Sequence, residues 1–263
     1  MGNSIGKVSL KISVITAVRN SRGTIGTAID SVRSQSYANL EYITVDGMSN
    51  DGTEEEIRKN ATVITRSIRE SDTGIYDALN KGLRAATGDV IGFLHADDFL
   101  ASEHVVSRIA DKFQSGDLDV VYGDLVYVKA NAPEITTRYW RSGTFRRSRF
   151  RRGWMPPHPT VYVRREIYEQ CGMYRTDIGS QADYECLLRL MFCHSLRVGY
   201  IPEVLVKMRQ GGESNVSLRN RLRANVGDRE AWKVNGLRPP FGLRFTKPLS
   251  KIPQYFRKPP NER

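Results

Sequence analysis

The chain has 263 residues, of which 40 are Lys or Arg and 29 are Asp or Glu, so its formal net charge is +11. With 40% hydrophobic and 26% charged residues it is typical of a globular protein, which excludes a disordered or fibrous chain. No apolar run approaches the roughly 18 residues of a membrane-spanning helix, and we expect no signal peptide. Three cysteines without a CxxC pair argue against a disulfide framework or a structural zinc site, and they predict reduced thiols in a cytoplasmic protein.

Strand and helix patterns alternate along the first half of the chain. Short apolar runs bounded by turn residues predict strands, at 11–18, 41–46, 62–65, 89–94 and 119–128. Apolar residues spaced three and four apart predict helices that lie on a sheet, at 25–32, 75–86 and 105–113. Thr53 and Glu56 predict a capping box for one further helix. Strands that alternate with helices indicate βαβ units and a mostly parallel sheet.

The second half of the chain has less regular patterns. They predict a hairpin over 119–139, a short helix over 166–171 and a final strand over 203–208. Ser180 is predicted to cap a longer helix, which places Asp183 and Glu185 in or near its first turn.

Three carboxylates follow predicted strands of the first half: Asp46, Asp97 and Asp98. In open sheets of this class the ligand lies beyond the carboxyl ends of the strands, so we expect these acids to meet in space. An adjacent pair such as Asp97 and Asp98 suits Mg²⁺ or Mn²⁺, although turn formation and helix capping also explain such a pair. The chain contains no GxxxxGK[ST], GxGxxG or GxSxG motif, which disfavours P-loop NTPases, dinucleotide-binding enzymes and α/β-hydrolases.

Positive charge is concentrated in two segments. Residues 216–263 carry a net charge of +9 together with six of the eleven prolines, and residues 138–152 carry +7. Without these two segments the chain is acidic, with a net charge of −5. The pattern predicts a poorly packed basic tail over 216–263, for which an anionic membrane, a nucleic acid or no partner at all are the open alternatives.

Five segments, in this order and spacing, resemble one enzyme family. They are ISVITAVRN at 12–20, VDGMSNDGT at 45–53, SDTGIYDALNKG at 71–82, GDVIGFLHADDFL at 88–100 and ADYECLLRL at 182–190. Together they resemble the inverting glycosyltransferases of family 2, over about residues 10–215. The resemblance implies a GT-A fold, which is an α/β fold with a Rossmann-like, mostly parallel central sheet and flanking helices, plus a small acceptor-side region and the basic C-terminal tail. It divides the chain into a donor-binding half at 1–128, an acceptor-binding and catalytic-base half at 129–215, and the tail at 216–263.

The resemblance also implies roles for individual residues. The donor-binding residues would be Thr16, Ala17, Asn20, Asp46, Asp72, Tyr76, Asp77, Lys81 and Asp97. Asp98 and Asp97 would hold a divalent metal, because His95 replaces the first acid of the DxD element. Gly47 likewise stands where many relatives carry a second acid. Asp183 aligns with the catalytic base.

The resemblance predicts the reaction and the partners in outline. A sugar would pass from a nucleotide sugar, expected to be UDP-linked, to a glycan or lipid-linked saccharide in surface polysaccharide biosynthesis, with Mn²⁺ or Mg²⁺ as cofactor. We predict acceptor contacts from His158, Glu185 and Arg152. The protein is expected in the cytoplasm, peripheral on the inner face of the membrane through its tail, with no nucleic acid partner. The alternatives are a non-catalytic nucleotide-binding relative, a sugar nucleotidyltransferase, and a nucleic-acid-binding protein that uses the tail.

Overall fold

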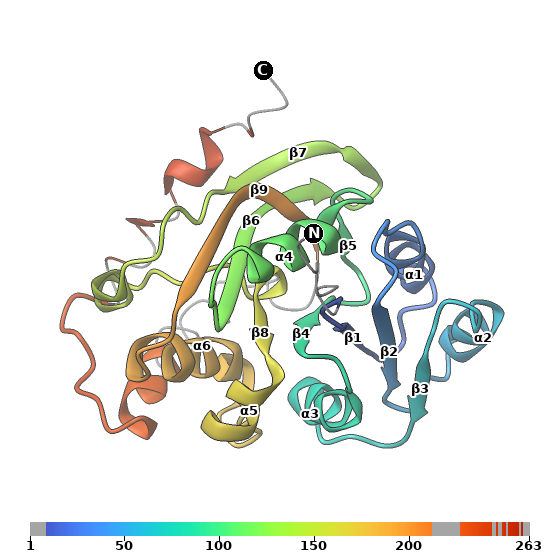
Figure 1. The fold of residues 1–263 in the computed structure, drawn as a ribbon, viewed down its shortest axis with the longest axis horizontal. Coiled ribbons are helices and arrows are strands. Elements are labelled where there is room, and N and C mark those ends of the chain that lie inside the picture. Colours follow the sequence, from blue (N-terminus) through green and yellow to red (C-terminus); the bar gives the residue numbers. More distant parts are fainter. Residues whose placement is uncertain are drawn as a thin grey trace, which may run out of the picture.

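A computed structural model describes residues 9–211, 227–243, 246, 249–250, 252–257 and 259. These residues form one nine-stranded sheet that curls across the molecule, with helices on both faces (Figure 1). The strands are β1 (Ile12–Val18), β2 (Leu40–Asp46), β3 (Arg66–Arg69), β4 (Val90–Phe93), β5 (Phe99–Leu100), β6 (Val120–Lys129), β7 (Ala132–Trp140), β8 (Tyr162–Arg164) and β9 (Val198–Arg209). Their order is β3-β2-β1-β4-β8-β6-β9-β5, and β7 pairs with β6.

The first part of the sheet is parallel and the second part is mixed. β3, β2, β1 and β4 run in the same direction, whereas β8 is antiparallel to both β4 and β6, and β6 is parallel to β9. β1 and β2 read as apolar runs in the sequence because parallel strands covered on both faces bury nearly every side chain. The predicted α/β architecture is confirmed.

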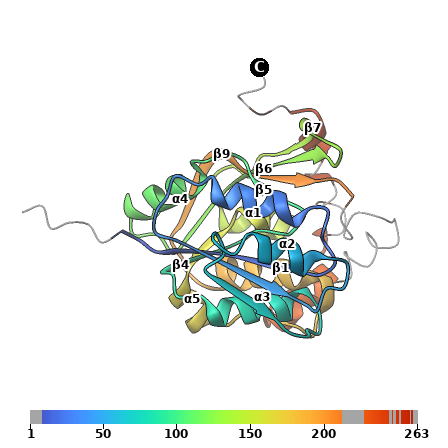
Figure 2. The ribbon, with the colours of Figure 1, turned by 90° about the vertical axis from the view of Figure 1, so that its right-hand side faces the viewer.

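Six α-helices between residues 25 and 188 cover the two faces of the sheet. They are α1 (Ile25–Arg33), α2 (Thr53–Lys59), α3 (Ile75–Ala85), α4 (Val105–Gln114), α5 (Arg165–Cys171) and α6 (Ala182–Leu188). α3, α5 and α6 lie along one face and α1 and α4 along the other, as Figures 1 and 2 show from two directions. The apolar stripe of each helix therefore contributes to one of two cores, one on each side of the sheet.

Short helical turns connect the strands of the second half. They are η1 (Arg147–Arg152), η2 (His158–Thr160) and η3 (Gly179–Gln181), and α6 continues into a π-helical turn, η4 (Arg189–Cys193). The predicted hairpin is confirmed, since β6 and β7 pair in antiparallel fashion. The first-turn position of Asp183 in α6 is confirmed as well.

Three local predictions are wrong. The third strand lies at Arg66–Arg69 rather than at 62–65. Thr53 is the first helical residue of α2 and forms no capping box, because its hydroxyl donates to Asp51. The residue that precedes α6 is Gln181, with no side-chain cap, so Ser180 does not cap this helix.

Part of the predicted basic tail packs against the body of the protein. Residues 227–234 are helical, Trp232 is buried, and its Nε1 donates to the Tyr184 hydroxyl at 2.9 Å. The expectation of a poorly packed tail is therefore wrong for the stretch 227–243, in which Leu243 is buried as well. The remainder of the tail lies largely outside the described residues. Among the described residues, no helix has the length and apolarity to cross a membrane.

Candidate active site

The carboxyl ends of β1, β2 and β4 meet at one edge of the sheet. Val18 pairs with Asp46, and Ile15 pairs with Phe93, after which the chain continues into His95-Ala96-Asp97-Asp98. The parallel topology thus places the acids that follow β2 and β4 at the same edge of the sheet.

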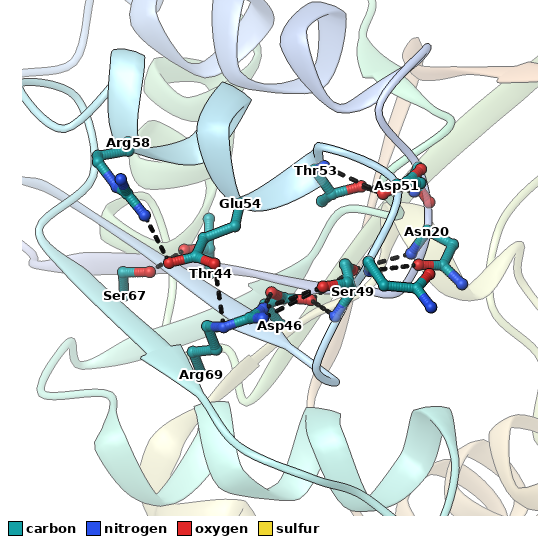
Figure 3. Close-up of polar contacts among 12 residues, drawn as sticks. Asn20, Thr44, Asp46, Ser49, Asp51, Thr53, Glu54, Arg58, Ser67 and Arg69 are labelled. Carbon is teal, nitrogen blue, oxygen red and sulfur yellow. Dashed lines mark hydrogen bonds and ion pairs between the residues drawn. The ribbon is translucent and has the colours of Figure 1, made fainter.

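Asp46 is a buried anchor of the loop that follows β2. Its Oδ1 accepts hydrogen bonds from the Ser49 backbone N–H at 3.0 Å and from the Ser49 hydroxyl, and its Oδ2 accepts one from Arg69 (Figure 3). The same guanidinium bonds the Ser49 carbonyl and Glu54. Both carboxylate oxygens therefore accept hydrogen bonds within the protein, and through them Asp46 shapes the loop.

The other predicted residues near β1 differ in their accessibility. Thr16 is fully buried, and its hydroxyl is hydrogen-bonded to the Tyr42 hydroxyl at 3.0 Å, while Ala17 packs in the core. Asn20 has a φ of 52°, is exposed, and accepts the Asn50 N–H through Oδ1. Of these three residues, only Asn20 has a side chain at the accessible edge.

Asp72 lies over Gly47. Its Oδ1 accepts the Gly74 N–H, and its Oδ2 would be 2.0 Å from a Cβ atom added at Gly47. A side chain at position 47 and the present place of Asp72 are therefore mutually exclusive. The Asp72 carboxylate fills the space that a residue at position 47 would otherwise enter.

Three further predicted residues line the same segment. Asp77 accepts the Thr73 N–H, and Lys81 lies 3.6 Å from Asp77 while its ammonium donates to the Ser71 carbonyl. The hydroxyl of Tyr76 donates to the Ser180 carbonyl at 3.2 Å, which ties α3 to the start of α6. Burial, followed by the charge of Asp183, raises the pKa of Tyr76, so it stays a neutral donor.

The two neighbouring aspartates differ in burial. Asp98 is 1% exposed, its Oδ1 accepts the Arg209 backbone N–H at 3.2 Å, and its Oδ2 has no hydrogen-bond partner among the described residues. Asp97 is partly exposed, and its carbonyl accepts a hydrogen bond from the Arg209 guanidinium at 2.8 Å. The end of β9 thereby fixes the loop that carries both acids.

Asp98 is a buried carboxylate whose charge is only partly balanced by a neighbouring cation. Burial, followed by the neighbouring charge of Asp97, raises its pKa well above the usual range, and Arg209 only partly offsets this effect. In the described part of the chain, no group of three or more His, Cys, Asp or Glu side chains could enclose a metal ion. Two carboxylates would need further oxygen ligands, such as the phosphates of a bound nucleotide, to hold one.

Asp183 is connected to the His95–Asp98 loop by contacts that run through His158 and His95. Its Oδ2 lies 3.3 Å from Nδ1 of His158, and Nε2 of His158 lies 2.6 Å from Nε2 of His95. Burial lowers the pKa of both imidazoles to about 4, and for His95 the neighbouring His158 adds to this effect. Residues from the loop after β4, from η2 and from α6 are thus brought together at one place.

The two other predicted acceptor residues differ in their exposure to solvent. Glu185 is 1% exposed, and both of its oxygens bond Arg189, which argues against an acceptor contact. Arg152 is exposed at the end of η1. Arg69 fixes the loop after β2, and Arg209 fixes the loop that carries Asp97 and Asp98. Neither arginine is predicted from the sequence, because isolated arginines in strands give no local signal of their partners.

Comparison with known proteins identifies the family. The chain matches Glycosyl transferase family 2 over residues 13–172. It is similar to a PGL/p-HBAD biosynthesis glycosyltransferase of Mycobacterium bovis, with 28% identity over 208 residues that cover 77% of this chain and 78% of the relative. The chain belongs to glycosyl transferase family 2.

Solved structures share the fold. S. aureus TarS 1-349 in complex with UDP superposes with a TM-score of 0.64 at 16% identity, over 84% of this chain and 65% of that chain. The mannosyltransferase PcManGT from Pyrobaculum calidifontis, in complex with GDP-Man and Mn²⁺, has a TM-score of 0.64 at 19% identity, over 92% of this chain and 70% of that chain. The expected GT-A glycosyltransferase fold is confirmed, and this chain spans just under two thirds of the TarS chain solved with UDP.

Proposed function

We propose that the protein transfers a sugar from a nucleotide sugar to a saccharide or lipid-linked saccharide acceptor in a single inverting displacement. The observation that carries this proposal is the meeting of Asp183 with the His95–Asp98 loop, over 2.6 and 3.3 Å contacts through His158. A base for the acceptor and acids for the leaving group would then lie on one accessible edge of the sheet.

Asp183 is the proposed general base. The acceptor hydroxyl attacks the anomeric carbon, its proton passes to the Asp183 carboxylate, and the bond from that carbon to the diphosphate oxygen breaks. Attack on the face opposite the diphosphate inverts the configuration in one step. Asp183 is partly exposed, with 21% of its side chain accessible, so an acceptor can approach it.

Asp97 and Asp98 are the proposed metal ligands. The fit rests on Asp98, whose Oδ2 is buried without a partner among the described residues, and on the hard oxygen donors that Mg²⁺ or Mn²⁺ prefers. When bound, the cation neutralises the charge that develops on the departing diphosphate. The Mn²⁺ complex of PcManGT supports a divalent cofactor for this fold.

Asp72 and Asn20 are the donor-facing residues that the geometry favours most. Asp72 fills the place next to Gly47, and Asn20 orders the loop after β2 through Asn50. We propose a UDP-linked donor, which the UDP complex of TarS supports, and a product that enters a surface glycan.

The C-terminal region is the proposed contact with an anionic membrane that carries the acceptor. Phe241 is 93% exposed and Phe256 is 82% exposed, and the exposed arginines of η1 add positive charge. Exposed aromatic side chains next to cations favour a lipid interface. Retention on vesicles that contain anionic lipid, but not on neutral vesicles, tests this contact. Equal retention on both would contradict it.

A panel of nucleotide sugars tests the enzymatic proposal. The purified protein is incubated with UDP- and GDP-linked sugars, with Mn²⁺ or Mg²⁺ and then with a chelator, and nucleotide release is measured. We expect slow release from one donor that stops on chelation and falls in Asp98→Asn. The exposed Asp111 of α4 provides a matched control, since Asp111→Asn should be unchanged. Nucleotide binding without any release would favour the non-catalytic alternative.

A further inference from the structure

Three side chains from separate elements form a continuous chain of contacts. His95 follows β4, His158 lies in η2, and Asp183 lies in the first turn of α6. The two imidazoles meet Nε2 to Nε2 at 2.6 Å, and the second ring nitrogen of His158 lies 3.3 Å from Oδ2 of Asp183. The rings are inclined by 70°, with their centroids 4.9 Å apart.

The two contacts constrain where the protons reside. Because an ionised carboxylate only accepts, donation from His158 to Asp183 across the 3.3 Å ion-pair distance requires the hydrogen on Nδ1. Burial lowers the pKa of His158 to about 4, and a neutral ring that donates from Nδ1 bears a lone pair on Nε2. His95 must then donate from its own Nε2. With the hydrogen of His158 on Nδ1, one arrangement of protons satisfies all three groups.

We propose that His158 is a positioning residue, which holds the Asp183 carboxylate through its Nδ1–H, and that His95 fixes the tautomer of His158. The inference rests on the proposed role of Asp183 as base. His158 keeps its own hydrogen throughout, and the acceptor proton moves only to Asp183. This role differs from the acceptor contact that the sequence predicts for His158.

The same arrangement gives His95 a role in setting the tautomer of His158. It stands where relatives carry the first acid of the DxD element, and a carboxylate there would attract a proton to Nε2 of His158. The hydrogen on Nδ1 would then be lost or the ring would become charged, and the support of Asp183 would change. A hydrogen-bond donor at position 95 is what the tautomer requires.

Amide variants separate the two ring nitrogens. The side-chain amide of His158→Asn replaces the donor at the Nδ1 position, whereas that of His158→Gln reaches only the Nε2 position. We expect kcat to fall about 100-fold in His158→Gln and within about 10-fold in His158→Asn, with an unchanged donor KM. His104→Gln on the surface serves as the control.

A double-mutant cycle distinguishes positioning from a merely structural role. If His158 acts through Asp183, then His158→Gln should cost little further activity in an Asp183→Asn background. Equal losses in the Asn and Gln variants, or losses that multiply with Asp183→Asn, would overturn the proposal. Melting temperatures of all variants show that each one folds.

A spectroscopic measurement tests the tautomer without any turnover. Imidazole nitrogen chemical shifts of the full-length protein should identify His158 as the Nδ1–H tautomer, and His95→Asp should change that assignment. An Nε2–H tautomer for His158 would refute the inference. If the wild type transfers no sugar, the proposed function fails, and the tautomer measurement still decides the arrangement of the three side chains.

Discussion

Glu41 of β2 gives a stability prediction with a calculable size. The side chain is 7% exposed and accepts hydrogen bonds from Ser13, from Lys11, and from both the backbone N–H and the hydroxyl of Thr87. Burial raises its pKa, but these hydrogen bonds outweigh burial and lower the pKa from 4.5 to about 2. At about 1.4 kcal/mol for each pKa unit, this shift means that ionisation of Glu41 contributes about 3.5 kcal/mol to folding.

Glu41→Gln should lose this contribution at neutral pH. The amide nitrogen would face two donors, so the free energy of unfolding should fall by about 3.5 kcal/mol in urea denaturation. Because the folded-state pKa is depressed, the contribution is complete above about pH 5 and declines as the pH falls toward 2. The difference between wild type and variant should therefore shrink by roughly half by pH 3.

Glu55→Gln on the exposed face of α2 is the matched control and should change the unfolding free energy by less than about 0.5 kcal/mol. A Glu41→Gln protein as stable as the wild type at pH 7 would refute the reasoning. A stability difference that does not depend on pH would refute it as well.

Two further predictions concern the site and the C-terminal packing. Gly47→Ala places a Cβ 2.0 Å from Oδ2 of Asp72 and so displaces the Asp72 carboxylate. Because losing a group that fixes the ligand costs about 1.4 kcal/mol, calorimetry should find the affinity for UDP reduced about 10-fold. Gly23→Ala, with open space around the new Cβ, should bind UDP like the wild type; equal affinities in both variants would contradict the placement of Asp72. Trp232→Phe removes the bond to the Tyr184 hydroxyl and should lower the free energy of unfolding by about 1–2 kcal/mol in urea; an unchanged transition would show that the tail does not dock there.

The sequence predicts the parallel part of the sheet because β1, β2 and β4 are buried on both faces and read as apolar runs. It misplaces β3, since this edge strand carries arginines at both ends and only Ile68 is partly buried in it. A strand without alternation or an apolar run has no periodic signal, so its position follows from pairing with β2.

The residues of the candidate site can be predicted from the sequence, but the contacts among them cannot. The acids at 46, 97 and 98 follow from the rule for strand ends, and the resemblance supplies Asp183. The contact between His95 and His158 joins residues 63 positions apart, and no local pattern reports it. The burial of Trp232 also depends on α6, which is distant in the sequence, so composition alone indicates only a basic tail.

The most direct measurement compares donor binding with turnover in Asp183→Asn. The account predicts that the variant binds the nucleotide sugar as tightly as the wild type, in the presence of Mn²⁺, while nucleotide release falls by about 10³-fold. Release at the wild-type rate, with binding unaltered, would contradict the assignment of Asp183 as the group that accepts the proton.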